Sequence, residues 1–369
     1  MNLIPSINSS KRIVIKIGSS LLFRKKQFNF EWLDSLLKDI LILKKNSIDI
    51  ALVVSGAVSL GREFLNLKNK KLKINHKQAC AACGQVILMQ NFMKSFKKKK
   101  IKVAQLLLTF ADTEDRKKSL NSRETINTLV NSNIIPIINE NDTVATEELK
   151  FGDNDRLASR VAQIFGAQNL ILLSDVDGLF DKNPKKNNKA KLIPVIKKID
   201  KKIINMASRE TNFFGSGGMS TKIQAAEIAS SFGCNTLICS GKINNPISNY
   251  LKNKKGTWFL SSKKSGSSFK NWLAGTIKVA GRVLVDDGAL KALLSGASLL
   301  PSGIKKISGK FYRGDIIEIM TLEGQKIGKG ISFYDSLEIE KIRGRKTSDI
   351  KNLLGYLATD EVIHRDNLS

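Results

Sequence analysis

The chain has 369 residues, of which 25% are charged and 42% hydrophobic, and its formal net charge is +28. This length exceeds what one hydrophobic core usually serves, so we expect two domains. Only 13 of the 61 basic residues are Arg and the excess is spread along the chain, which favours a generally basic surface over a specific nucleic-acid site.

Cysteine content and hydropathy exclude two further classes. Four cysteines at this length do not predict a disulfide framework, and the Cys80-Ala-Ala-Cys83 motif lies in an Ala-rich helical stretch, where buried small residues are expected. The first ten residues lack the pattern of a signal peptide, and no apolar run has the length of a membrane span. We expect a reduced, cytoplasmic protein.

Short β-branched runs alternate with longer stretches of helical period. The first 260 residues predict strands at 12–17, 48–54, 102–108, 134–138, 169–173 and 235–239, with helices at 31–45, 77–96, 121–130, 155–165 and 220–232. Strands that are apolar on both faces indicate a parallel sheet covered by helices on both sides. The pattern therefore predicts an α/β fold, a three-layer αβα sandwich with a mostly parallel central sheet.

The composition changes near residue 261, where a polar, Ser-rich and Lys-rich segment begins. We expect a catalytic domain at 1–260, a linker at 261–275 and a second domain at 276–369. Short β-like runs at 277–279, 282–285 and 316–319, separated by glycines, and a helix at 288–294 predict a small, β-rich, barrel-like domain.

Carboxylates and carboxamides gather just after the predicted strand 134–138. They lie in Asn139-Glu-Asn-Asp142 and in Phe151-Gly-Asp-Asn-Asp155. Clustered carboxylates repel one another unless a cation or polar ligand lies among them, and ligands bind at the carboxyl ends of parallel strands. The two segments therefore predict a binding loop.

Three turns combine Gly and Ser with the ends of predicted elements. They are Lys16-Ile-Gly-Ser-Ser20, Ser55-Gly-Ala57 and Gly215-Ser-Gly-Gly-Met-Ser-Thr-Lys222. Backbone N–H groups in such turns can face an anion, Ser220 or Thr221 is expected to cap the following helix, and Lys222 would project from its first turn. We interpret the three turns together as a phosphate site.

Several enzyme classes are not supported. The chain has neither a G-x-x-x-x-G-K-[ST] loop nor a G-x-G-x-x-G after its first strand, and His76 and His364 are its only histidines. Any chemistry must then work without a histidine base. Phosphoryl transfer to a carboxylate meets this restriction, because a carboxyl group is already ionised at pH 7.

These residues together resemble the amino-acid kinase family, and the similarity runs nearly end to end. Besides the turns and loops above, it includes Lys77-Gln-Ala, Gly84-Gln85, Gln105-Leu-Leu-Leu-Thr109, Arg116, Asn121-Ser-Arg123, Ser174-Asp175 and Gly178-Leu179. Residues 276 to about 360, with Val285-Asp-Asp-Gly-Ala289 and Gly309-Lys-Phe-Tyr-Arg-Gly314, look like the PUA module, known elsewhere for binding RNA.

The resemblance implies ATP-dependent phosphorylation of the γ-carboxylate of L-glutamate, the first step of proline biosynthesis. By motif, the implied catalytic residues are Lys16, Lys222 and Asp155, and the implied glutamate site is Ser55, Asp142, Asn154 and Asn139. The implied ATP site comprises Lys16, Ser174, Asp175, Ser216, Gly217, Gly218, Met219, Ser220, Thr221 and Lys222. Mg²⁺ would be carried mainly by ATP rather than by protein ligands.

The resemblance also implies partners. Proline would act as a feedback inhibitor, the chain would form a dimer or tetramer, and a glutamyl phosphate reductase would consume the product. Two alternatives stay open: a family member acting on aspartate or N-acetylglutamate, and an RNA-binding PUA protein. The modest charge of the C-terminal part leaves RNA binding unsupported. Its aromatic residues Phe311, Tyr312, Phe333 and Tyr334 are interpreted as core or domain packing rather than as a base-stacking platform.

Overall fold

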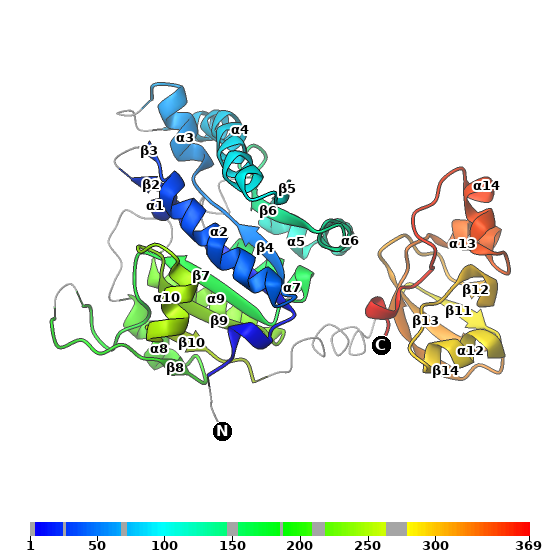
Figure 1. Cartoon of the computed structure of the whole chain (residues 1–369). Helices are drawn as coiled ribbons and strands as arrows, with labels where there is room; N and C mark the ends of the chain where they lie inside the picture. The colour runs from blue at the N-terminus through cyan, green and yellow to red at the C-terminus, as the bar shows by residue number, and fades with distance from the viewer. Residues whose placement is uncertain are drawn as a thin grey trace. The chain divides into compact units, whose positions relative to one another are not determined.

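The computed structural model describes residues 4–24, 27–67, 72–145, 154–184, 187–208, 218–262 and 279–369. The chain divides into two compact units, Met1–Ser265 and Gly266–Ser369 (Figure 1). The predicted linker falls largely on 263–278, outside the described residues, so the domain limits predicted from the sequence stay a prediction.

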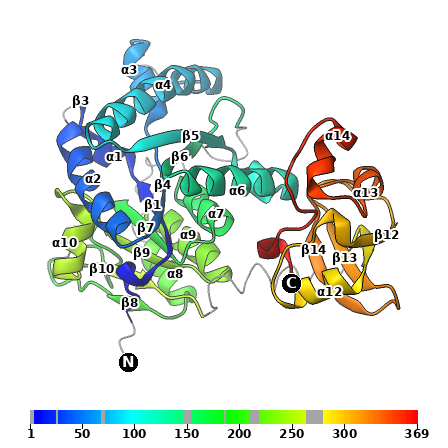
Figure 2. The same ribbon diagram turned by 45° about the vertical axis from the view of Figure 1, so that its right-hand side comes forward.

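An eight-stranded sheet forms the centre of the N-terminal unit, in the order β5-β6-β4-β1-β7-β9-β10-β8 (Figure 2). Its strands are β1 (Arg12–Ile17), β4 (Asp49–Val53), β5 (Lys102–Leu108), β6 (Ile134–Glu140), β7 (Asn169–Ser174), β8 (Val195–Ile196), β9 (Asn235–Ser240) and β10 (Gly256–Phe259). Neighbouring strands pair in parallel except for β9 and β10, which are antiparallel. A two-stranded ribbon, β2 (Phe23–Arg24) and β3 (Gln27–Phe28), lies outside this sheet.

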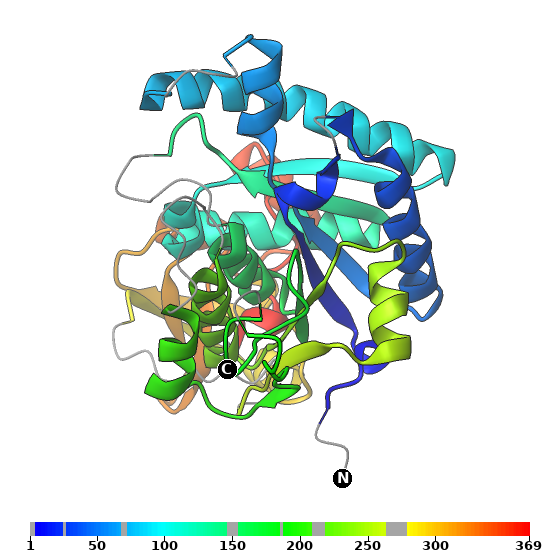
Figure 3. The ribbon, with the colours of Figure 1, turned by 90° about the vertical axis from the view of Figure 1, so that its left-hand side faces the viewer.

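Helices cover both faces of the sheet. They are α1 (Ser19–Leu22), α2 (Phe30–Lys45), α3 (Ala57–Phe64), α4 (Ile74–Lys98), α5 (Phe110–Glu114), α6 (Arg116–Asn131), α7 (Asn154–Phe165), α8 (Lys201–Ser208), α9 (Met219–Ser231) and α10 (Pro246–Asn253), and a 3₁₀ turn, η1 (Ile7–Ser9), precedes β1. Figure 3 shows the sheet between its two helical layers, with α2 in blue and α10 in yellow-green on one side.

Two apolar cores correspond to the two faces of the sheet. One packs α2, α4 and α10 against strand residues that include Ile13, Ile15 and Ile17, and the other packs α7 and α9 against residues that include Val14. Successive side chains of a strand point to opposite faces, which accounts for this alternation along β1. Burial on both faces confirms the predicted three-layer α/β architecture.

Helices α3 and α4 pack unusually closely beside the β5 edge of the sheet, as Figures 1 and 2 both show. A Cβ atom on Gly84 of α4 would lie 1.8 Å from the carbonyl oxygen of Ala57, and one on Gly61 of α3 would lie 1.7 Å from that of Cys80. Glycine at both positions therefore permits the contact between the two helix backbones. All four cysteines are free; Cys80 is buried in this contact region, whereas Cys83 is only partly buried.

The C-terminal unit contains a four-stranded mixed sheet in the order β12-β11-β13-β14. Its strands are β11 (Gly281–Val285), β12 (Ile304–Ser308), β13 (Ile316–Thr321) and β14 (Lys326–Ile331), and its helices are α12 (Asp287–Leu294), α13 (Ser336–Ile342) and α14 (Ile350–Leu354), with short 3₁₀ turns at η2 (Pro301–Gly303), η3 (Thr347–Asp349) and η4 (Arg365–Asn367). The predicted β-rich domain is confirmed, while the strand predicted at 277–279 falls mainly outside the described residues.

The predicted core role holds for three of the four aromatic residues in this unit. Phe311, Phe333 and Tyr334 are buried, but Tyr312 is 54% exposed and is not part of the core, so that domain packing stays a prediction for it. Tyr312 lies in a turn in which its backbone N–H donates to the side chain of Asp315, and this turn directs the ring outward.

Candidate active site

The candidate site forms where strands end at the centre of the sheet. The strands β4, β5 and β6, which follow β1 in sequence, lie on one side of it in the sheet, and β7 and the later strands lie on the other side. The strand order therefore reverses at β1. Ligands of open α/β sheets bind at the carboxyl ends of the strands at such a point. Lys16, Ser55, Asn139 and Ser174 lie at or just after the carboxyl ends of β1, β4, β6 and β7.

Alternation along β1 selects the face to which Lys16 points. Lys16 shares the face of Val14, which is covered by α7 and α9. Asp155 lies in the first turn of α7, and Lys222 lies near the start of α9. The sheet and two separate helices thus bring together three charged residues that are far apart in the sequence.

The three residues form one buried ion cluster. The Nζ atom of Lys16 lies 2.6 Å from Oδ1 of Asp155, and that of Lys222 lies 3.0 Å from Oδ2. The side chain of Asp155 is fully buried, and those of the two lysines are 9% and 6% exposed. Burial alone would raise the pKa of Asp155, but the two ammonium groups outweigh it and lower the pKa to about 2. The cluster carries a net positive charge and can attract an anion.

Thr221 connects the start of α9 to this cluster. Its hydroxyl lies 3.0 Å from Oδ2 of Asp155 and 2.8 Å from the carbonyl oxygen of Gly218. The N-cap of α9 is Gly218, and no side chain caps the helix. The prediction that Ser220 or Thr221 caps this helix was therefore wrong, because the helix begins at Met219 and the hydroxyl of Thr221 turns toward Asp155 and the Gly218 carbonyl.

A chain of carboxamides continues from Asn154, the residue before Asp155. Nδ2 of Asn154 donates to the carbonyl oxygen of Val54 and to Oδ1 of Asn139 at 2.8 Å. Nδ2 of Asn139 in turn donates to Oε1 of Gln85 on α4 at 2.7 Å. All three carboxamide residues are at least 92% buried. The predicted residues Asn139 and Asn154 are thus brought together, and Gln85 joins them.

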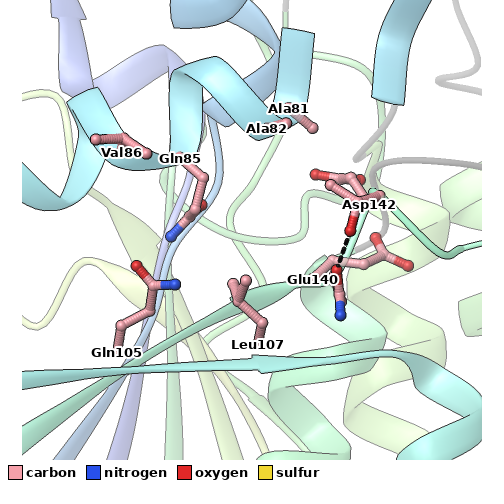
Figure 4. Close-up of a pocket in the computed structure, with 10 residues that line it drawn as sticks. Ala81, Ala82, Gln85, Val86, Gln105, Leu107, Glu140 and Asp142 are labelled. Atoms are coloured by element: carbon pink, nitrogen blue, oxygen red, sulfur yellow. Dashed lines mark hydrogen bonds between the residues drawn. The ribbon is translucent and has the colours of Figure 1, made fainter. Parts of the chain in front are cut away.

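Asp142 lies in a short turn after β6 and lines a pocket beside these three carboxamides. The pocket has a volume of about 240 Å³ and is lined by residues of α4, β5 and the turn after β6 (Figure 4). Burial raises the pKa of Asp142 to about 6. A carboxylate in this state gains from a cation in the pocket, because opposite charge favours its ionised form.

Of the other residues predicted for the site, some make a single side-chain hydrogen bond and some lie outside the described residues. Ser55 donates from its hydroxyl to the carbonyl oxygen of Ile17 at 3.2 Å, which leaves its oxygen available as an acceptor. Ser174 is 4% exposed at the end of β7, and its hydroxyl lies 3.2 Å from Oδ1 of Asp175, which is exposed. Met219 and Ser220 begin α9, whereas Ser216, Gly217 and the loop 146–153 lie outside the described residues.

Sequence reasoning gave Gln85 no role. Its motif, Gly84-Gln85, contributed to the resemblance, but nothing in the sequence connects it to Asn139, which is 54 positions away. Two absences hold for the described part of the chain: it contains no group of three or more His, Cys, Asp or Glu side chains that could hold a metal ion, and no helix in it could cross a membrane.

Comparison with known proteins shows the family to which the chain belongs. Residues 11–240 match the Amino acid kinase family, and residues 281–354 match the PUA domain. The chain belongs to the amino acid kinase family.

Within that family, the chain is similar to curated glutamate 5-kinases over almost its whole length. It is 47% identical to the glutamate 5-kinase of Pelagibacter ubique over 98% of this chain and 99% of that protein. It is 45% identical to the glutamate 5-kinase of Allorhizobium ampelinum over 98% of this chain and 93% of that protein.

Proposed function

We propose that this chain transfers the γ-phosphoryl group of ATP to the γ-carboxylate of L-glutamate, giving L-glutamyl 5-phosphate and ADP. The observation that carries the proposal is the buried cluster in which one carboxylate, Asp155, holds two lysine ammonium groups at the carboxyl ends of the central strands. Similarity to glutamate 5-kinases over both domains supports the same reaction.

The two lysines supply what this transfer requires. An oxygen of the γ-carboxylate attacks the γ-phosphorus as the bond from phosphorus to the ADP oxygen breaks. Nucleophile and phosphoryl group are both negative, so cations must offset their repulsion. Lys16 and Lys222 would do so from the two sides of Asp155, whose ionised form fixes both ammonium groups in place. The carboxylate nucleophile is ionised at pH 7, so no general base is needed.

The glutamate site would lie beside the cluster. Asn154 and Asn139 are held by the buried hydrogen bonds described above, and Asp142 presents to the pocket a carboxylate that forms no ion pair with any of the described residues. These groups, together with the Ser55 oxygen, suit an amino acid, because an ammonium group needs acceptors and a carboxylate needs donors. The discrimination between glutamate and aspartate or N-acetylglutamate would arise here.

ATP would bind toward Ser174, Asp175 and the segment 216–222. Mg²⁺ would be carried by ATP rather than by protein ligands, and it would supply charge neutralisation at the transferred group. Lys16 and Lys222 would then contact the phosphoryl oxygens, and the first turn of α9 would direct its N–H groups to them. We propose that the protein is a soluble, cytoplasmic enzyme and that its reaction is the first step of proline biosynthesis.

We also propose how the protein is regulated and with which partners it acts. Proline would inhibit by competing with glutamate, the chain would assemble as a dimer or tetramer, and a glutamyl phosphate reductase would consume the product. The C-terminal PUA domain is assigned no RNA-binding role, and we expect any RNA association to ignore sequence and to disappear at moderate salt.

One assay tests the reaction directly. Purified protein is incubated with ATP, Mg²⁺ and glutamate, and acyl phosphate is trapped with hydroxylamine, with aspartate and N-acetylglutamate as parallel substrates. We expect hydroxamate from glutamate alone, and inhibition by added proline that more glutamate relieves. Product from aspartate or N-acetylglutamate but not from glutamate would overturn the proposal.

A further inference from the structure

Gln85 is the end of the carboxamide chain and has one polar atom left over. Its Oε1 accepts the hydrogen bond from Asn139, while Nε2 is buried and has no hydrogen-bond partner among the described residues. The residue is 8% exposed. Buried side-chain donors are rarely left without an acceptor, so each such case calls for an explanation.

Neighbouring hydrogen bonds fix which way the Gln85 amide faces. Asn154 uses Nδ2 to donate to Val54 and Asn139, so the Oδ1 atom of Asn139 must be its acceptor end. Nδ2 of Asn139 is then a donor, and only the oxygen of Gln85 can receive it. A reversed Gln85 amide would place two donors face to face. The Nε2 atom of Gln85 is therefore held as a donor that points away from the hydrogen-bonded carboxamides of Asn139 and Asn154.

That donor points into the pocket of about 240 Å³ that Asp142 also lines. Figure 4 shows the amide nitrogen of Gln85 directed from α4 toward Gln105, with Glu140 and Asp142 at the other end of the space. The volume is below the roughly 300–1,000 Å³ typical of sites for drug-sized ligands and suits a small metabolite. The pocket thus offers a fixed donor at one end and a carboxylate at the other.

We propose that Gln85 is a specificity-determining residue that donates from Nε2 to the α-carboxylate of the amino-acid substrate while Asp142 accepts from its ammonium group. This inference rests on the proposed function and adds a residue to its site. The γ-carboxylate must reach the lysines around Asp155, and the ammonium group requires an acceptor such as Asp142. The α-carboxylate is the group left, and the Gln85 amide is the buried donor left for it.

Two substitutions test the donor by different routes. Gln85→Glu keeps an oxygen for Asn139 and replaces the donor with an acceptor, whereas Gln85→Met removes the donor without adding charge. We expect KM for glutamate to rise about 10- to 100-fold in both, the value of a hydrogen bond to a charged group, with KM for ATP within about twofold of the unsubstituted protein. Gln90→Glu, at an exposed position of the same helix, is the matched control and should leave both constants within about twofold.

A substrate analogue separates the proposed contact from a structural role. 4-Aminobutyrate is glutamate without the α-carboxylate, so the Gln85 contact cannot form with it. In Gln85→Met, the ratio of kcat/KM for glutamate to that for 4-aminobutyrate should fall by the same factor by which KM for glutamate rises. A general disturbance of the site would lower both values together and leave the ratio unchanged.

The outcomes divide clearly. A matching rise of KM in both variants with a reduced ratio supports the inference. Unchanged KM in both variants, a rise in Gln85→Glu alone, or an unchanged ratio overturns it. These results presuppose hydroxamate formation from glutamate by the unsubstituted protein, and absence of that product would instead overturn the proposed function.

Discussion

Lys16 and Asp155 form a buried ion pair in which Nζ of the lysine lies 2.6 Å from Oδ1 of the aspartate. The lysine comes from the central strand β1, and the aspartate comes from α7, which covers the same face of the sheet. The pair can form only when both layers of this side of the fold are in place. Assembly of the site therefore requires that the core on this face of the sheet has formed.

Lys222→Ala should lower kcat by about 10²- to 10³-fold, comparable to the loss of one preorganised electrostatic contact. One of the two cations that face the transferred phosphoryl group is removed, and Asp155 keeps only Lys16. Steady-state release of ADP at saturating glutamate measures the effect, and Lys252→Ala, at an exposed position of α10, is the control. Near-normal turnover would remove Lys222 from the reaction.

Asp155→Asn should change how stability depends on pH. The folded-state pKa of Asp155, about 2, is below the ordinary value of 3.8, so its ionised form stabilises the fold above pH 4 and this contribution is lost as pH falls through 2. We expect the difference in unfolding free energy between the two proteins to narrow by about 2 kcal/mol between pH 5 and pH 2. Urea unfolding of the kinase domain at several pH values measures it. A difference that stays constant with pH would contradict the ion cluster.

Hydrophobic period made most of the kinase-domain architecture predictable. The bounds predicted for the first strand and for 102–108 match β1 and β5, because the first run is rich in apolar β-branched residues and the second consists mostly of apolar residues. Helix α3 was not predicted: it is short and contains Gly61, a poor helix former, and packing against α4 stabilises it instead. Strand β10 has only four residues and carries too little periodicity to identify.

In the candidate site too, some residues could be predicted from the sequence and others could not. Motifs and the family resemblance predicted the lysines and Asp155, because each stands at the end of a recognisable element. Gln85 could not be predicted, because its significance depends on the hydrogen bond to Asn139 and on the pocket into which its other end points. Contacts of this kind arise only from the packing of α4 against the sheet.

Asp142→Ala should raise KM for glutamate and leave KM for ATP nearly unchanged, because a contact to the substrate ammonium group is lost. We expect a rise of about 10- to 100-fold, the value of a hydrogen bond to a charged group. Initial rates with either substrate varied at saturation of the other measure both constants. A larger change in KM for ATP than for glutamate would show that Asp142 lies in the nucleotide site instead.

Asp142 also predicts a pH dependence of glutamate binding. Burial raises its pKa to about 6, so the group is neutral below that pH and ionised above it. Only the ionised form pairs with an ammonium group, and KM for glutamate should therefore fall as pH rises from 5 to 7. Asp142→Asn should remove this part of the profile. The same profile in both proteins would assign the titration to another group.

Gly84→Ala should destabilise the kinase domain, although alanine is the better helix former by about 1 kcal/mol. The added Cβ would lie 1.8 Å from the carbonyl oxygen of Ala57, so α3 and α4 must move apart, and overpacking of this kind typically costs about 1–3 kcal/mol. Gly288→Ala, in helix α12 of the C-terminal unit, is the control for the same change of residue in a helix without a close contact, because its Cβ would meet no atom closer than 3.4 Å. Thermal unfolding should show a lower midpoint temperature for Gly84→Ala than for the unsubstituted protein. The midpoint temperature of Gly288→Ala should not be lowered. Equal midpoints in both would contradict the close approach of α3 and α4, on which the position of Gln85 depends.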